Sequence, residues 1–168
     1  MNYSISYDTA TKIITPIALI AMVAGLGTLW MTGIEEMRAY KYLSLAVLFI
    51  VLILSWGYAP KSYSIDDGRV CVNRMLMQPF EILISDIASV EVVPKQRLKG
   101  SIRTFGSGAF FGYYGRFTNR HFGAMRWYAT NLNNAVLIRT RENKKIILTP
   151  NERDSFINAI QSSIKKAA

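Results

Sequence analysis

The chain has 168 residues, of which 51% are hydrophobic, and it combines a formal net charge of +9 with a mean hydropathy of +0.17. This combination excludes a simple soluble globule, and a single cysteine and a single histidine exclude a disulfide scaffold and a Cys/His metal cluster. Residues 1–60 hold as many acidic as basic residues, so the whole excess charge lies in residues 61–168.

Two long uncharged runs follow a short N-terminal segment, residues 1–12. The runs cover residues 13–34 and residues 42–60, and a short polar loop, residues 35–41, separates them. As helices they would be about 33 and 28 Å long, close to the thickness of a hydrocarbon core of about 30 Å. Aromatic residues lie near the ends of both runs, as in an interfacial belt. The pattern predicts a two-helix transmembrane hairpin that anchors the chain.

Two other interpretations fit these runs less well. A cleaved signal peptide is disfavoured by Asp8 and by the lack of a clear small-residue cleavage site, and buried helices of a soluble protein are disfavoured by the length of both runs. Neither run contains an ionisable side chain, so no ion or proton pathway is predicted. Basic residues flanking the hairpin outnumber those of its loop, so we expect both termini in the cytoplasm and the hairpin in the cell (inner) membrane.

Residues 61–168 predict short strands followed by one helix. The turn Asp66-Asp67-Gly68 joins two alternating runs within residues 63–75, which is the signature of a β-hairpin. Further strands are expected at residues 80–84, 87–93, 127–130, 135–140 and 145–148. Thr149, Pro150 and Glu152 predict the cap and first turn of a helix over about residues 150–166. The apolar stripe of this helix consists of Phe156, Ile157, Ile160 and Ile164.

Several stretches of this second part resemble a known family. The glycine- and aromatic-rich stretch from Arg103 to Phe117, the run Trp127-Tyr128-Ala129-Thr130 and the ending from Ile147 to Glu152 are similar to bacterial pleckstrin-homology (PH) domains of small membrane proteins. The resemblance begins near Ser62. It implies a mainly β (α+β) domain: a PH-like, seven-stranded antiparallel barrel or sandwich, capped by a C-terminal helix and preceded by two transmembrane helices.

The resemblance implies little about biochemical activity. Eukaryotic PH domains that bind phosphoinositides place lysine and arginine around a long loop between their first two strands. In this chain the corresponding connection is the tight, acidic turn Asp66-Asp67-Gly68. The inositol-phosphate site of those relatives is therefore not expected here.

Residues 95–127 form the candidate functional segment, and they are expected to be a long irregular stretch. Such a stretch in a compact domain is usually functional or mobile. The segment combines basic residues with aromatic residues and has no acidic residue. The candidate residues for binding an anionic lipid or a partner are Lys95, Arg97, Lys99, Arg103, Arg116, Arg120 and Arg126. The candidate interface aromatics are Phe110, Phe111, Tyr113 and Tyr114.

Three interpretations of this segment remain open. Its aromatic residues could close one end of their own domain, it could dock a partner protein or a second copy of the chain, or it could bind anionic phospholipid. We expect a membrane-anchored, non-catalytic binding or scaffold module for protein interaction or membrane-complex assembly. Anionic-lipid binding is the alternative, and an accessory subunit of a membrane enzyme or transporter is a further one.

Other functions have less support from the sequence. The membrane anchor disfavours nucleic-acid binding, although basic and aromatic residues together also bind single strands. His121 has no acid or nucleophile near it in the sequence, so we predict no catalytic residue and no enzyme. No cofactor and no metal site are predicted.

Overall fold

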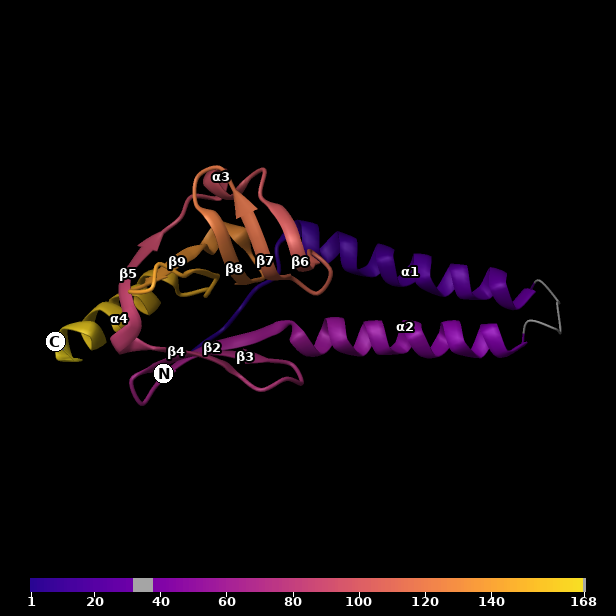
Figure 1. The fold of residues 1–168 in the computed structure, drawn as a ribbon, viewed down its shortest axis with the longest axis horizontal. Helices are drawn as coiled ribbons and strands as arrows, with labels where there is room; N and C mark the ends of the chain where they lie inside the picture. Colours follow the sequence, from indigo (N-terminus) through magenta and orange to yellow (C-terminus); the bar gives the residue numbers. More distant parts are fainter. Residues whose placement is uncertain (32–37, 168) are drawn as a thin grey trace.

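The computed structural model describes residues 1–31 and 38–167. Two long antiparallel helices, α1 (Thr9–Met31) and α2 (Arg38–Tyr58), extend side by side from one end of a sheet-rich domain (Figure 1). Both are long and apolar enough to cross a membrane, and none of the residues in their most apolar windows is buried. Their exposed apolar surfaces indicate a membrane protein. The end of the first expected span and residues 35–37 of the expected loop lie outside the described residues.

The first helix begins four residues before the uncharged run. Asp8 precedes it and accepts a hydrogen bond from the backbone N–H of Thr11 at 2.9 Å, which satisfies one of the unpaired donors of the first turn. Near the far ends of the two helices, the rings of Trp30 and Tyr42 meet edge to face with centroids 5.9 Å apart. The helices therefore form an antiparallel pair.

Two sheets make up the domain. The first has the strand order β1-β2-β3-β4, and the second has the order β5-β9-β10-β8-β7-β6. The strands of the first sheet are β1 (Asn2–Tyr3), β2 (Pro60–Asp66), β3 (Arg69–Arg74) and β4 (Phe80–Leu83). Those of the second are β5 (Ile87–Val92), β6 (Ile102–Gly108), β7 (Tyr113–Asn119), β8 (Gly123–Ala129), β9 (Val136–Thr140) and β10 (Lys145–Leu148).

Short helices connect some of these strands, and a longer one follows them. The short ones are η2 (Ile84–Asp86), α3 (Lys95–Leu98) and η3 (Leu132–Asn134), and the last helix is α4 (Arg153–Ala167). The expected hairpin is present as β2 and β3, which pair through Asp66 and Arg69 around a turn with positive φ at Asp67 and Gly68.

The sheets differ from the expected seven-stranded, all-antiparallel arrangement. The described residues contain ten strands in two sheets, one of four strands and one of six, and β10 pairs with β8 in parallel. The largest difference lies in residues 95–127. Instead of a long irregular stretch, they form α3 and most of the antiparallel meander β6-β7-β8. The N-terminal segment also contributes a strand, because β1 pairs with β2.

Hydrophobic residues cover both faces of the six-stranded sheet. One cluster fills the space between the two sheets and α4 and contains Tyr63, Tyr114, Tyr128 and Phe156. The other lies on the opposite face, where Trp127 and its neighbours pack with residues of α3 and η3. Because each face has its own core, consecutive residues of one strand can both be buried.

The last helix begins later than expected. Phe156 and Ile160 are fully buried and Ile157 and Ile164 pack beside them, which confirms the predicted apolar stripe. The helix starts at Arg153, so Thr149 is not its cap. Thr149 is instead a buried residue whose Oγ1 accepts hydrogen bonds from the backbone N–H groups of Thr130 and Asn131.

Candidate functional site

The seven basic candidate residues do not form one patch. Lys95 and Arg97 lie on α3, Lys99 directly follows it, and Arg120 lies in the turn between β7 and β8. Asn119 ties that turn to α3, because its Nδ2 donates to the carbonyl oxygen of Arg97 at 3.0 Å. These four basic residues share one end of the β6-β7-β8 meander.

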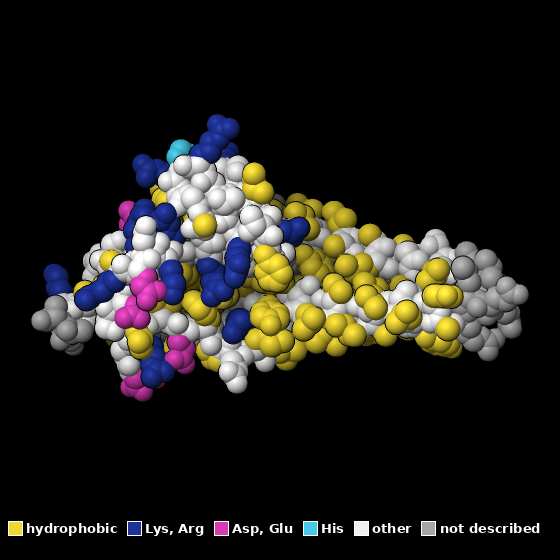
Figure 2. Space-filling model, viewed as in Figure 1, with side chains coloured by type: hydrophobic (Ala, Val, Ile, Leu, Met, Phe, Trp, Pro, Cys, Tyr) yellow, Lys and Arg dark blue, Asp and Glu magenta, His cyan; other side chains and the backbone are white. Residues whose placement is uncertain are grey.

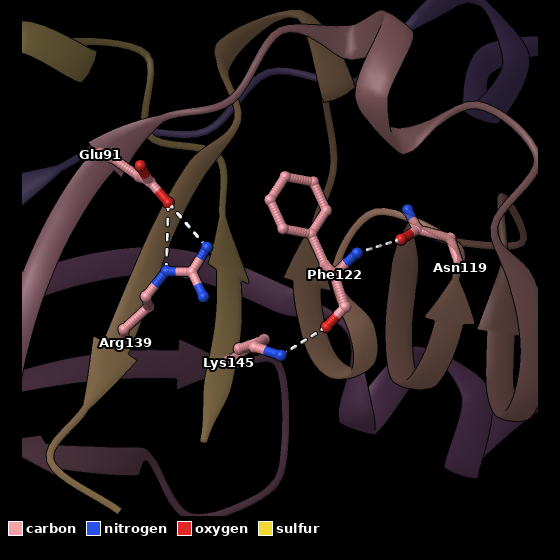
Figure 3. A network of polar contacts seen from close by, with 5 residues as sticks. All are labelled: Glu91, Asn119, Phe122, Arg139 and Lys145. Carbon is pink, nitrogen blue, oxygen red and sulfur yellow. Dashed lines mark hydrogen bonds and ion pairs between the residues drawn. The ribbon is translucent and has the colours of Figure 1, made fainter. Parts of the chain in front are cut away.

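Polar contacts fix the turn that carries Arg120 (Figure 3). Lys145 donates from Nζ to the carbonyl oxygen of Phe122 at 2.6 Å, and Asn119 Oδ1 accepts the backbone N–H of Phe122 at 2.8 Å. Arg139 bonds Glu91 at 3.1 Å and lies with its guanidinium 5.9 Å from the centre of the Phe122 ring. His121, next to Arg120, is exposed on the same turn.

Arg103 lies apart from the other basic residues, on edge strand β6. Its Nη1 is 3.7 Å from the point that a Cβ on Gly108 would occupy, so the side chain extends along β6 toward the loop at its end. With Ile14 of α1 and Trp127 of β8 it lines a cavity of about 470 Å³. On the same strand Ile102 and Phe105 are 67% and 74% exposed.

Arg116 and Arg126 are brought together by strand pairing. They lie directly opposite each other on β7 and β8, and both are exposed. The guanidinium of Arg126 lies 5.3 Å from the centre of the Phe80 ring of β4, a cation–π distance. Phe80 was not among the candidate residues, since its contact with Arg126 depends on how the two sheets pack.

The aromatic candidates lie where the domain meets the two helices. Phe110 and Phe111 belong to the loop between β6 and β7, with their rings 4.5 Å apart, and both are partly buried. Thr15 of α1 holds this loop, because its hydroxyl accepts the backbone N–H of Phe111 at 3.0 Å and donates to the carbonyl oxygen of Ala109 at 3.3 Å.

The two tyrosine candidates make polar contacts with residues at the helix ends. Tyr113 donates from its hydroxyl to Asp8 Oδ2 at 3.1 Å. Burial, and after it the charge of Asp8, raises the pKa of Tyr113 to about 12. The hydroxyl of Tyr114 donates to the carbonyl oxygen of Ser55 of α2, near the end of that helix. The tyrosines therefore link the sheet to both helices.

No sequence pattern predicted that Asp8 and Thr15 contact the sheet at this junction. The position of Asp8 indicates a helix cap, because an aspartate just before an apolar run commonly caps a helix. The position of Thr15 indicates no such role, because its partners are nearly a hundred residues away in the chain. No cluster of three or more metal-binding side chains occurs among the residues that the structure describes.

Comparison with known proteins identifies the second part of the chain. The family model of the bacterial PH domain matches residues 61–164. This range contains β3 to β10, all of β2 except Pro60, and α4 as far as Ile164. Searches of the curated proteins and of the solved structures return no significant match. Since the family model covers more than half of the chain, the protein belongs to the bacterial PH-domain family.

Proposed function

We propose that this protein is a membrane-anchored, non-catalytic binding module that acts in the assembly of a membrane complex. The family supports a binding role without catalysis, because PH domains are generally non-catalytic binding modules. In this proposal α1 and α2 cross the cell membrane, and residues from about 61 onward form the cytoplasmic domain. The charge distribution supports the orientation, because Lys12, Lys61, Arg69 and Arg74 flank the hairpin whereas only Arg38 and Lys41 lie at its other end.

The observation that carries the proposal is the close connection between the helices and the domain. Only Ala59 separates the end of α2 from the start of β2, and that residue is fully buried. Before α1, the strand β1 joins the first sheet. Two hydrogen bonds also cross the junction between helices and domain, one from the N–H of Phe111 to Thr15 and one from the hydroxyl of Tyr114 to the carbonyl oxygen of Ser55. A domain without a flexible tether presents its surfaces at a fixed height and orientation above the membrane, which suits a scaffold.

Binding of anionic lipid by residues 95–127 is the second candidate function. It is supported by Arg103, which lines the cavity beside α1 at the base of the helix pair. The exposed Phe105 lies on the same edge strand, between Arg103 and the loop that contacts α1, where it would contact the membrane interface. The loop that contacts α1 lies at one end of β6 and β7. The four basic residues of α3 and the β7–β8 turn, Lys95, Arg97, Lys99 and Arg120, lie at the other end of these strands.

Insertion of a flexible linker tests the assembly role. A Gly/Ser linker of about ten residues is inserted between Ala59 and Pro60. It separates the domain from the end of α2 and leaves every residue of the domain unchanged. We expect the altered protein to lose the membrane partner that crosslinks to and co-purifies with the full-length chain. The same linker inserted between Asp67 and Gly68, in the exposed turn that joins β2 and β3, is the control and should retain the partner. Retention of the partner by both proteins would contradict a scaffold role.

A lipid measurement distinguishes the second candidate. Native mass spectrometry of the full-length chain, extracted from membranes of mixed lipids, reports which phospholipids stay bound. If the second candidate is right, anionic phospholipids should be enriched on the protein. The Arg103→Gln substitution and high salt should each reduce this enrichment. Equal retention of anionic and zwitterionic lipids by both proteins would rule it out.

A further inference from the structure

A groove with a volume of about 900 Å³ runs between the two sheets of the domain. One wall is formed by all four residues of β4, and the other by residues of β7 and β8 that include the exposed Arg116 and Arg126. The turn between β9 and β10 lies at one end. Figure 2 shows Lys and Arg side chains gathered over the region of β7 and β8, with acidic side chains farther from the helices. The groove therefore has a basic wall facing a strand.

The strand that lines the groove is the edge of its sheet. In the order β1-β2-β3-β4, β4 pairs with β3 alone among the described strands, and its residues Phe80 to Leu83 match Val72 to Arg69. The backbone N–H and C=O groups on its outer side are therefore available to another strand. An exposed edge of this kind can accept an extended peptide, whose main chain supplies the hydrogen bonds.

The charge of the opposite wall restricts the peptide that fits. Arg116 and Arg126 are directly opposite each other, an arrangement that like charges make unfavourable unless an anion lies between them. Neither forms an ion pair with a carboxylate in the described part of the chain. The ring of Phe80 supports Arg126 at the groove wall. Two guanidinium groups so placed can each bind a carboxylate through two hydrogen bonds.

The acidic residues of the groove have their own partners or lie at its end. Glu81 pairs with Arg69 at 2.6 Å, and Glu142 pairs with Lys144 at 2.6 Å. Asp86 belongs to η2, after the end of β4. The positive charge of the two arginines is therefore not cancelled within the groove, and an acidic ligand complements it.

We propose that this groove binds an extended acidic segment of a partner protein, which adds as a strand to β4 and places its carboxylates at Arg116 and Arg126. The inference rests on the proposed assembly function and names the kind of partner segment involved. A second copy of the chain fits less well, because it would bring further arginines to the same place. A lipid headgroup would use the arginines but leave the edge of β4 unpaired.

A labelled peptide tests the inference on the full-length chain in nanodiscs of zwitterionic lipid. The probe is a peptide of alternating valine and glutamate, about eight residues long, which is within the usual range of strand lengths. Fluorescence anisotropy should show binding, at least about tenfold weaker binding to R116Q/R126Q, and little change for the matched variant R97Q/K99Q outside the groove. A peptide with lysine in place of glutamate should not bind.

Strand addition has its own control. N-methylation of alternate backbone nitrogens keeps the charge of the probe and removes its hydrogen-bond donors on one edge, so at least one of the two methylation registers should weaken binding. Unchanged binding of both methylated peptides, unchanged binding to R116Q/R126Q, or no binding of the probe would each overturn the inference. A photocrosslinker at the exposed Leu83 should react with the probe. Reaction with another copy of the chain or with lipid instead would assign the groove to that occupant and reject the inference.

The outcome can be separated from that of the proposed function. If R116Q/R126Q still co-purifies with the membrane partner while the linker insertion after Ala59 loses it, the assembly function stands and the groove inference fails. If the linker insertion also retains the partner, the proposed function itself fails.

Discussion

The hydroxyl of Tyr63 joins the two sheets through the middle of the core. The side chain is fully buried, and its hydroxyl donates to the carbonyl oxygen of Tyr128 at 2.6 Å and accepts the backbone N–H of Thr149 at 3.2 Å. The ring packs 6.1 Å from that of Phe156 of α4. A single side chain from β2 thus contacts the ends of β8 and β10 and the last helix.

Replacing Tyr63 with phenylalanine should lower the free energy of unfolding by about 1–3 kcal/mol, because two buried backbone groups would each lose a hydrogen-bond partner. The change in volume is small, so a packing defect does not explain such a loss. Thermal or denaturant unfolding of the full-length protein in one detergent measures it. Tyr40→Phe is the matched control, since the side chain of Tyr40 is 67% exposed. Equal stability of both variants would contradict this role of the hydroxyl.

Tyr113 should make the stability of the protein sensitive to alkaline pH. Burial and Asp8 raise its pKa to about 12 from the ordinary value of 10.0. Below pH 10 the phenol is protonated in both states, so its contribution to stability is fully present. Between pH 10 and about 12 the unfolded chain loses the proton and the folded chain keeps it, so stability falls as pH rises.

The melting temperature measured against pH, together with the ultraviolet absorbance of tyrosinate, tests this. Tyr113→Phe should lose less stability than the parent protein across that pH window, because it removes the shifted group. Asp8→Asn should lower the pKa of Tyr113 only part of the way, since burial is the larger cause of the shift. An unchanged pH profile of stability in Tyr113→Phe would show that this tyrosine does not determine the alkaline limit.

At the scale of elements, two glycines determine how closely β6 and β7 approach. Gly106 and Gly115 face each other in the strand pairing, with φ of +104° and +116°. A Cβ on Gly106 would overlap the carbonyl oxygen of Tyr114, and a Cβ on Gly115 would overlap that of Phe105. Both the backbone conformation and the space therefore require glycine.

Alanine at Gly106 or Gly115 should destabilise the protein by about 2–5 kcal/mol, the sum of backbone strain and a steric clash. Hydrogen exchange should increase in β6 and β7 before it increases in β2 and β3, because the clash is confined to the first pair. Gly108→Ala is the control in the same strand, since the atom nearest to its Cβ would be 3.7 Å away. Equal exchange in both pairs of strands would argue against a local clash.

The sequence predicted α1, α2 and α4, the strands β2 to β5, β9 and β10, and the last part of β8, and it missed β1, β6 and β7. α1 and α2 are uniformly apolar, and β2–β3 and α4 alternate between buried and exposed positions, so composition and periodicity identify them. β6 and β7 have no continuous apolar run and no period of two, because glycines and arginines interrupt both strands. The run at residues 127–130 is predicted as a strand although Trp127, Tyr128 and Ala129 are consecutive and all buried, because both faces of the sheet are covered there.

The candidate site could likewise be predicted only in part from the sequence. Its basic residues were identified from composition, but their grouping depends on register and packing. Arg116 and Arg126 are ten positions apart in the chain and meet only because Asn119 pairs with Gly123 at the turn. Phe80 and the edge of β4 join them through the packing of one sheet against the other, which no local pattern predicts.

At the scale of the whole molecule, the N-terminus returns to the domain that the rest of the chain forms. The N-terminal amine of Met1 donates to the carbonyl oxygen of Ile65 at 2.8 Å, and the N–H of Ile65 donates back to Met1 at 2.8 Å. Further hydrogen bonds join Ser4 to Asn151 and Ser6 to Asn131. Because α1 leaves the domain and α2 returns to it (Figure 1), the proposed membrane anchor places the N-terminal segment and the domain on one side of the membrane.

Labelling of single cysteines with a membrane-impermeant maleimide tests this topology. In a Cys71→Ser background, cysteines at the exposed positions Asn2 and Lys99 should react from the same side, and a cysteine at Met31 should react from the opposite side. The charge bias further predicts that Asn2 and Lys99 react in inverted membrane vesicles and not in right-side-out ones. Reaction of Asn2 and Lys99 from opposite sides would require β1 to leave β2, and it would contradict the packing of the N-terminal segment on the domain. If the cysteines at positions 2 and 99 both react in right-side-out vesicles alone, the fold stands and only the predicted orientation is reversed. The pairing of β1 with β2 determines that the two positions share one side of the membrane, whereas the basic residues alone determine which side that is.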